Sequence, residues 1–177
     1  MVSKPVIHLP DSLIAKSYRW SDQVVKDYAN GNNPNSLDVT VLDADKDPEL
    51  QAHGKMAEVA FAIYAGYDPL QQVSWTRHCD GGFDLLWHNM LWDIKHTKRG
   101  FNLIWPLGKN KIFDSKHFDN LALVRGEKPN FEISGWITKQ IFAKRHKVAG
   151  KNHFLEEGTR HIDMRELWGI DSIGLLW

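Results

Sequence analysis

Hydrophobic residues recur with helical spacing in two stretches of the first half of the chain. Residues 11–30 carry apolar side chains every three or four positions, which predicts an amphipathic helix interrupted near Ser21. Residues 49–65 predict a second helix, which ends at Gly66. From 56 to 65 this second helix is apolar on almost every side. A helix of that kind is usually buried, so we expect it in the core.

Shorter apolar runs in the remaining chain predict β-strands, because they are rich in branched and aromatic residues and are bounded by turn formers. We expect these strands over 37–42, 83–87, 90–97, 120–125 and 131–137. Most of them follow one another closely enough to pair antiparallel. Residues 162–167 predict a short helix. The order of helices and strands indicates an α/β or α+β fold, with a central mixed β-sheet flanked by helices.

The length and composition favour one folded domain. The chain has 177 residues, of which 42% are hydrophobic, and eight are tryptophan; this is enough apolar area for one core and excludes a disordered chain. We expect a single domain over 1–177, with an N-terminal helical extension at 1–48, a core at 49–140 and a basic and helical C-terminal segment at 141–177.

The sequence contains no feature typical of a membrane or secreted protein. The longest apolar run, 59–66, is far shorter than the ~20 residues needed to span a bilayer. The N-terminus lacks the apolar stretch of a signal peptide, and the single Cys79 cannot form an internal disulfide. We therefore expect no membrane association and a reducing, cytoplasmic location.

Charge is distributed unevenly, although the formal net charge is zero. Residues 1–90 carry seven Lys/Arg and twelve Asp/Glu, whereas residues 91–177 carry fifteen and ten. An anionic partner would therefore bind the second half. Five basic residues there have no acid among them: Lys139, Lys144, Arg145, Lys147 and Lys151. Such a run fits a nucleic-acid backbone, and it equally fits a solvated helix face or loop.

Two predicted strands bring acidic side chains together. His88 and Asn89 separate the apolar runs at 83–87 and 90–97, and asparagine tolerates the positive φ of a tight turn. If these two residues form the loop of a hairpin, residues whose numbers add up to 177 lie opposite each other. Asp84 then faces Asp93, and Lys95 shares the face of Asp93 because side chains alternate along a strand.

Two opposed carboxylates need a cation nearby. At ~5 Å and an effective dielectric constant of about 20, their repulsion is roughly 3 kcal/mol. Lys95 supplies one positive charge, and a divalent ion that prefers oxygen ligands, such as Mg²⁺, would supply the rest. Glu58 is the one charged residue in the apolar stretch 56–65. A buried carboxylate needs a cation, so we expect Glu58 to share the metal site with Asp84 and Asp93.

This order of residues resembles the PD-(D/E)XK nuclease superfamily, which includes restriction enzymes, Holliday junction resolvases and phage endonucleases. The family pattern is a helix Glu, a strand Asp, and an Asp-x-Lys on the next strand. Glu58, Asp84 and the sequence Asp93-Ile94-Lys95 match it. Segments 118–124 and 132–138 resemble the third and fourth core strands, so the likeness spans about 49–140. Phe83 stands where many members have proline.

The resemblance implies a restriction-endonuclease-like fold and a Mg²⁺-dependent or Mn²⁺-dependent endonuclease that cleaves DNA, leaving 5′-phosphate ends. RNA is not excluded. It implies that Asp84, Asp93, Glu58 and the carbonyl of Ile94 bind the metal. Lys95 would orient the attacking water. The residues expected to contact nucleic acid are Lys98, Lys139, Lys144, Arg145, Lys147 and Lys151. By analogy, a homodimer could cut both strands.

Several alternatives stay open from the sequence. Asp80, next to two glycines, competes with Asp84 as the first acid, although a turn role fits it better. Glu58 could instead pair with an arginine such as Arg77. The same fold could bind nucleic acid without catalysis. A zinc hydrolase would need ligands from a histidine and cysteine set whose spacing matches no common zinc motif. That set is His78, Cys79, His88 and His96.

Overall fold

The computed structural model describes residues 4–30, 47–75, 83–105, 113–151, 153 and 155–175. The predicted strand at 37–42 and residues Arg77, His78, Cys79 and Asp80 lie outside this part of the chain. The helices are α1 (Asp11–Ala29), α2 (Pro48–Tyr64), α3 (Pro69–Gln72) and α5 (Lys139–Arg145), with short 3-10 helices η3 (Met164–Glu166) and η4 (Ile170–Leu175).

The strands form two sheets. They are β1 (Val6–His8), β2 (Leu85–Trp87), β3 (Met90–Thr97), β4 (Asn102–Trp105), β5 (Asn120–Glu127), β6 (Asn130–Thr138), β7 (Lys147–Val148) and β8 (Arg160–Asp163). The larger sheet has the order β1-β6-β5-β3-β2, and the smaller has the order β4-β8-β7. In the larger sheet β3 and β5 run parallel and the other neighbours run antiparallel.

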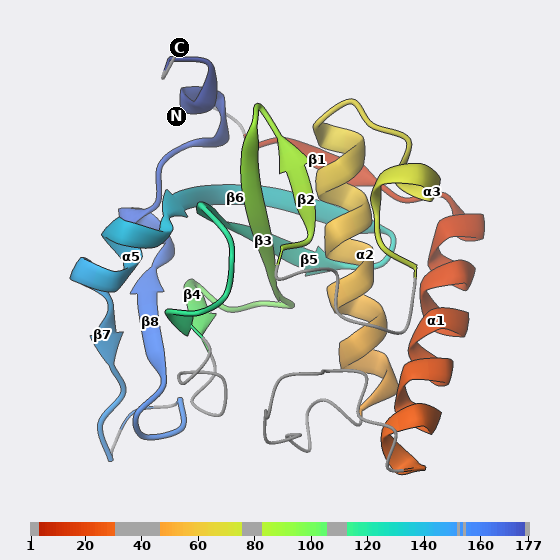
Figure 1. Ribbon diagram of the computed structural model, residues 1–177, viewed down its shortest axis with the longest axis horizontal. Coiled ribbons are helices and arrows are strands. Elements are labelled where there is room, and N and C mark those ends of the chain that lie inside the picture. Colours follow the sequence, from red (N-terminus) through yellow and green to blue (C-terminus); the bar gives the residue numbers. More distant parts are fainter. Residues whose placement is uncertain are drawn as a thin grey trace.

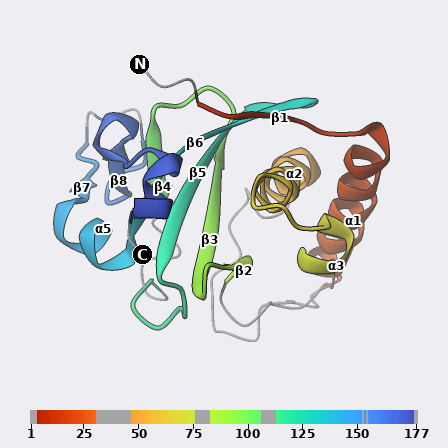
Figure 2. The ribbon, with the colours of Figure 1, turned by 90° about the horizontal axis from the view of Figure 1, so that it is seen from above.

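The layers of the molecule follow from these sheets. Helix α2 covers one face of the larger sheet and α1 packs on the outer side of α2, whereas the smaller sheet and α5 lie on the opposite side (Figures 1 and 2). The predicted class, a mixed β-sheet flanked by helices, is confirmed at this level. No helix within the described ranges is long and apolar enough to cross a membrane.

The two long helices begin and end close to the positions expected from the sequence. Helix α1 runs unbroken through Ser21, whose hydroxyl donates to the carbonyl of Pro48 at the start of α2; the predicted interruption is therefore wrong. The side chain of Asp47 caps α2 by accepting two N–H groups of its first turn, at 2.8 and 3.3 Å. Gly66 follows α2 with a φ of 81°, which glycine adopts without strain.

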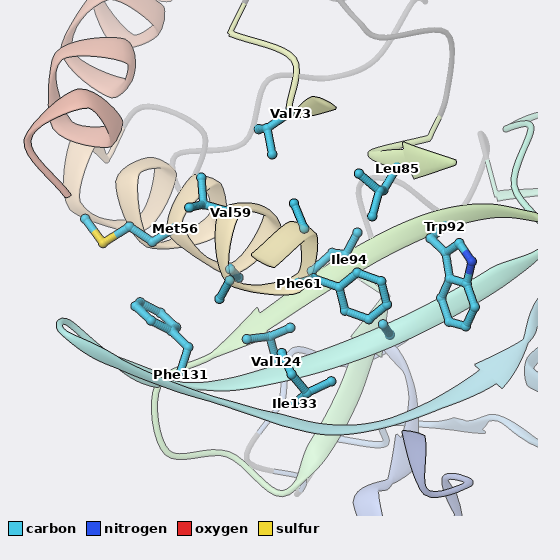
Figure 3. Packing of buried hydrophobic residues seen from close by; sticks show 14 of the residues in the cluster. Met56, Val59, Phe61, Val73, Leu85, Trp92, Ile94, Val124, Phe131 and Ile133 are labelled. Carbon is cyan, nitrogen blue, oxygen red and sulfur yellow. The ribbon is translucent and has the colours of Figure 1, made fainter. Parts of the chain in front are cut away.

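The main hydrophobic core lies between α2 and the larger sheet (Figure 3). Phe61 of α2 is fully buried, and its ring centroid lies 5.3 Å from that of Trp92 on β3. Ile94 of the same strand packs in the same cluster. The expectation that the apolar stretch of α2 is buried is confirmed. Because Trp92 and Ile94 face α2, the side chains between and beyond them on β3 face the other side of the sheet.

A second core lies on that other side, between the larger sheet and the smaller one. It contains Leu103 and Trp105 of β4, Phe113, and Phe142 of α5. Leu91 of β3 packs against it. Asp93 and Lys95, which alternate with Trp92 and Ile94, therefore leave β3 toward this second layer.

The predicted strands at 83–87, 90–97, 120–125 and 131–137 correspond to β2, β3, β5 and β6. The predicted helix at 162–167 is wrong in its first part, because Ile162 and Asp163 belong to β8 and only 164–166 form a helical turn. Strands β1, β4, β7 and β8 are too short for a clear alternation pattern. The parallel pairing of β3 with β5 was also not expected from their sequences.

Candidate active site

The hairpin of β2 and β3 has the register that the sequence predicts. Leu85 pairs with Trp92 and Trp87 with Met90, so the numbers of each pair add up to 177. His88 and Asn89 form the two-residue loop with φ values of 51° and 57°. Two successive positive φ values are typical of the type I′ turn, whose twist matches that of paired strands.

The paired residues of β2 and β3 end at Leu85 and Trp92, one pair before Asp84 and Asp93. Asp84 instead lies along the edge of β3. Its N–H donates to the carbonyl of Trp92 at 2.7 Å, and its carboxylate oxygen Oδ2 accepts the N–H of Ile94 at 2.6 Å. The expected direct opposition of Asp84 and Asp93 is therefore replaced by a bend. In an extended strand the N–H and C=O of one residue point to the same edge, so the carbonyl of Ile94 faces the edge that Asp84 covers.

Asp93 is fully buried and is compensated by two lysines. Its Oδ2 lies 2.5 Å from Nζ of Lys95, and its Oδ1 contacts Nζ of Lys116. Burial acts to raise the pKa of the Asp93 carboxyl, but the ammonium groups of Lys116 and Lys95 outweigh it and hold that pKa below its usual range. Asp93 is thus a carboxylate at neutral pH despite its burial.

Lys95 forms an ion pair with Asp93 and interacts electrostatically with Asp84. Burial lowers the pKa of its ammonium group, Lys116 lowers it further, and the carboxylates of Asp93 and Asp84 act in the opposite direction. The same ammonium lies 4.6 Å from the centroid of the Trp105 ring, where a cation is attracted by the electron-rich face of the indole. The ion pair with Asp93 and the contact with the Trp105 ring therefore hold the Lys95 ammonium in position.

Lys116 is the site residue that the sequence did not reveal. It follows Phe113 in the segment before β5, and no motif marks it. Its backbone is held by Lys139, whose Nζ donates to the carbonyls of Lys116 at 2.7 Å and Asp114 at 3.1 Å. Lys139 was expected to contact nucleic acid, but its ammonium instead holds the backbone of the segment that carries Lys116. Lys116 brings a second positive charge to Asp93, beside that of Lys95.

Glu58 does not join this cluster. It lies on α2, on the opposite face of the larger sheet from Asp93, and its carboxylate contacts Nζ of Lys55. Lys55 is itself almost buried, donates to the carbonyl of Ser74 at 3.0 Å and lies 4.3 Å from the ring of Trp20. The partner that Glu58 needed is thus a lysine three residues earlier on the same helix.

No group of three or more His, Cys, Asp or Glu side chains within the described ranges could hold a metal ion together. The joint metal site of Glu58, Asp84 and Asp93 that the sequence predicts is therefore not assembled. Two carboxylates remain near each other on β3 and at its edge. The oxygen atoms there belong to Asp84, Asp93 and the carbonyl of Ile94, and those of Asp93 contact Lys95 and Lys116.

Of the histidines considered for zinc, His88 and His96 lie in the described part of the chain, and they are not brought together. His88 lies in the hairpin turn, and His96 lies six residues beyond Met90 on β3, roughly 20 Å away at the rise of a strand. His96 faces α2, where it stacks on His53 with ring centroids 5.5 Å apart and hydrogen-bonds through Nε2 to the carbonyl of Gly126.

The remaining basic residues of the predicted nucleic-acid surface lie outside the cluster. Lys144 and Arg145 are exposed in the last turn of α5, and Lys151 is also exposed. Lys147 pairs with Glu166 at 3.0 Å. Lys98, just beyond β3, is 2.5 Å from the carboxylate of Glu127. The α5 end thus presents adjacent positive charges, while Lys98 and Lys147 are each already paired with an acid.

No protein-family model matches the chain, and the searches of curated proteins and of solved structures found no significant match. The function is therefore argued from the residues and their geometry alone.

Proposed function

We propose that this protein is a divalent-metal-dependent endonuclease that hydrolyses phosphodiester bonds of DNA on a restriction-endonuclease-like core. One observation carries the proposal: Asp84, Asp93 and Lys95 gather at one end of the β2–β3 hairpin, where Lys95 pairs with Asp93 at 2.5 Å and interacts electrostatically with Asp84. The order along the chain is the one that the nuclease superfamily uses, an acid on one strand and Asp-x-Lys on the next.

The oxygen atoms at this edge fit Mg²⁺ or Mn²⁺. Carboxylate and carbonyl oxygens are hard ligands, and Mg²⁺ is commonly held by one or two carboxylates while it keeps several waters. Asp84, Asp93 and the carbonyl of Ile94 are the residues that would hold the cation. When bound, such a cation lowers the pKa of a coordinated water and neutralises charge on the phosphate.

Lys95 is suited to act on the attacking water and the phosphate. Its ammonium is fixed by Asp93 at 2.5 Å and by the ring of Trp105, so little conformational freedom is lost when it donates to a substrate oxygen. Preorganised donors of this kind stabilise the charge that develops in the transition state. Asp93 therefore has two roles, one toward the cation and one in orienting Lys95.

The charges of the cluster also suit an anionic substrate. Asp84 and Asp93 contribute two negative charges, and Lys95 and Lys116 contribute two positive charges, so the four side chains together are neutral before any ligand binds. A phosphodiester group would meet no net repulsion there. The exposed end of α5, with Lys144 and Arg145, supplies positive charge for contacts with the DNA backbone.

The direct test is to incubate the purified protein with labelled duplex, branched and single-stranded DNA and with RNA, in Mg²⁺, Mn²⁺, Zn²⁺ or EDTA. We expect cleavage in Mg²⁺ or Mn²⁺, none in EDTA, and 5′-phosphate ends. The variants Asp93→Asn and Lys95→Met should lose activity. Asp163→Asn is a matched control. Asp163, at the end of β8, is also paired with a basic residue, since its carboxylate lies 2.7 Å from the guanidinium of Arg165.

Other outcomes would identify the alternatives. Tight DNA binding without cleavage in any metal would indicate a binding module that has no catalytic activity. Cleavage supported by Zn²⁺ and abolished by changing His88 or His96 would indicate a histidine-bound metal hydrolase. The first of these differs from a nuclease in activity alone, so affinity and cleavage have to be measured on the same preparation. A homodimer, which would place two such sites on one duplex, is tested by the molecular mass in solution.

A further inference from the structure

An exposed aromatic side chain lies just beyond the candidate active site. Phe101 directly precedes β4, in the connection that leads from the larger sheet to the smaller one (Figure 1). Its side chain is 61% exposed. Its backbone is nevertheless fixed, because its carbonyl accepts the N–H of Met164 at 2.7 Å. The N–H of the preceding Gly100 donates to the hydroxyl of Thr97 at 3.0 Å. The phenyl ring is therefore presented to solvent from a held backbone.

Arg125 of β5 holds this ring from one side. Its guanidinium carbon lies 5.5 Å from the centroid of the Phe101 ring, within the range in which a cation is attracted to the face of an aromatic ring. Arg125 is itself held by Glu132, its paired residue on β6, whose carboxylate lies 3.1 Å from Nη2. The Phe101–Arg125 pair thus offers an open aromatic surface beside a positive charge.

The Phe101–Arg125 pair lies on the same face of the larger sheet as Lys95. Thr97 follows Lys95 by two positions on β3, so both side chains point toward the second layer. Arg125 is the residue of β5 that pairs with Thr97. From the rise of a strand and the spacing between strands, the Cα atoms of Lys95 and Arg125 are roughly 8 Å apart. A polymer bound at Lys95 would therefore reach the Phe101 ring with a neighbouring unit.

The charge around the pair suits an anionic polymer. Four basic side chains share two acids there, which leaves a net charge of two. The ion pairs join Lys4 and Arg125 to Glu132, and Lys98 and Arg99 to Glu127. Arg99 is the most exposed of the four, at 85%. Exposed aromatic rings among basic side chains are the combination that proteins use to bind unpaired nucleic acid, because every base has a face that can stack.

Resting on the proposed function, we propose that Phe101 and Arg125 bind an unpaired nucleotide of the substrate next to the phosphate that is cleaved. The base stacks on the Phe101 ring, and the adjoining phosphates contact the surrounding basic side chains, Arg99 above all. A base inside a duplex cannot stack there, because its neighbours cover both of its faces and extruding it costs energy. The substrate class is therefore DNA with an unpaired segment, such as a single strand, an overhang or a branch.

The test separates stacking on the base from attraction to the phosphates. Binding is measured by anisotropy in EDTA with a labelled single-stranded oligonucleotide, an abasic oligonucleotide of the same length and a blunt duplex. Phe101→Ala should bind the single strand about tenfold more weakly than wild type, which corresponds to ~1.4 kcal/mol. Its affinity for the abasic strand and the duplex should be unchanged. Phe101→Trp should keep the affinity for the single strand, whereas Phe101→Leu, which is apolar without a ring, should behave like Phe101→Ala.

Leu70→Ala is the matched control, since Leu70 on α3 is also an exposed apolar side chain, at 53%. It should match wild type with every DNA. Equal losses on the normal and abasic strands for Phe101→Ala, or no loss on either, would overturn the inference, and cleavage in Mg²⁺ by the same preparation would leave the nuclease intact. Phe101-dependent binding of the single strand without cleavage in any metal would support the inference and overturn the proposed function. Wild type that binds none of the three DNAs would overturn both.

Discussion

Asp93→Asn should destabilise the metal-free protein, and the sign of this effect separates two descriptions of the site. If Asp93 mainly faced another carboxylate, neutralising it would relieve roughly 3 kcal/mol of repulsion and stabilise the fold. The structure instead places Asp93 between the ammonium groups of Lys95 and Lys116. Asparagine has the same shape but leaves both lysines without their shared counter-ion.

The magnitude follows from the burial of the three groups. Breaking a buried ion pair by removing one partner costs about 3–5 kcal/mol, whereas an exposed pair is worth ~0–1 kcal/mol. Asp93 is fully buried, and the side chains of Lys95 and Lys116 are 22% and 19% exposed. Partial solvation of the lysines lowers the loss, so we expect Asp93→Asn to cost about 2–4 kcal/mol.

Urea unfolding in EDTA, monitored by tryptophan fluorescence, measures this loss in the free energy of unfolding. Because the folded-state pKa of Asp93 is lowered, its stabilisation is complete above the unfolded-state pKa, about 3.9, and is lost as the pH falls through the lower folded-state value. The gap between wild type and variant should therefore stay constant from neutral pH to about pH 5 and narrow below about pH 4. Asp163→Asn should change little. A variant equal to or more stable than wild type at pH 7 would refute the placement of Asp93.

Three further predictions follow from the fold. Phe61→Ala should lose about 3–5 kcal/mol in the same urea assay because Phe61 is fully buried; a loss under ~1 kcal/mol would remove it from the core. Asp47→Ala should lose ~1 kcal/mol with the cap of α2, and Asp47→Asn should retain most of it. Replacing Lys144, Arg145 and Lys147 by alanine should weaken DNA binding and flatten its dependence on salt by up to ~3 in the log–log slope; an unchanged slope would place the DNA surface elsewhere.

The hairpin could be predicted because its determinants are local. A two-residue loop at His88 and Asn89 fixes the register of the strands on either side, and the alternation of Trp92 and Ile94 with Asp93 and Lys95 then follows. The same reasoning predicts one further pair, Asp84 with Asp93, which the structure does not form. The bend at Asp84 depends on its side chain accepting a backbone N–H, which no alternation pattern encodes.

The cation that compensates each acid was harder to identify. For Glu58 the signal was present, since Lys55 stands three residues earlier on the same helix and such pairs face each other. For Asp93 there was no local signal. Lys116 lies 23 residues away in the chain, and its approach depends on the parallel pairing of β3 with β5 and on the Lys139 contacts, which are tertiary features.

The rate of DNA cleavage by Lys95→Met under single-turnover conditions in Mg²⁺ tests the central claim most directly. Lys95 pairs with Asp93 and interacts electrostatically with Asp84, and methionine keeps most of its length while removing its charge. We expect the rate constant to fall by at least ~10²-fold, with DNA affinity in Ca²⁺ within a few-fold of wild type. The control is Lys16→Met, because Lys16 on α1 also lies over a tryptophan, 4.4 Å from the ring of Trp75; its rate should equal that of wild type. Cleavage by Lys95→Met at the wild-type rate would show that the chemistry, if present, takes place elsewhere on the molecule.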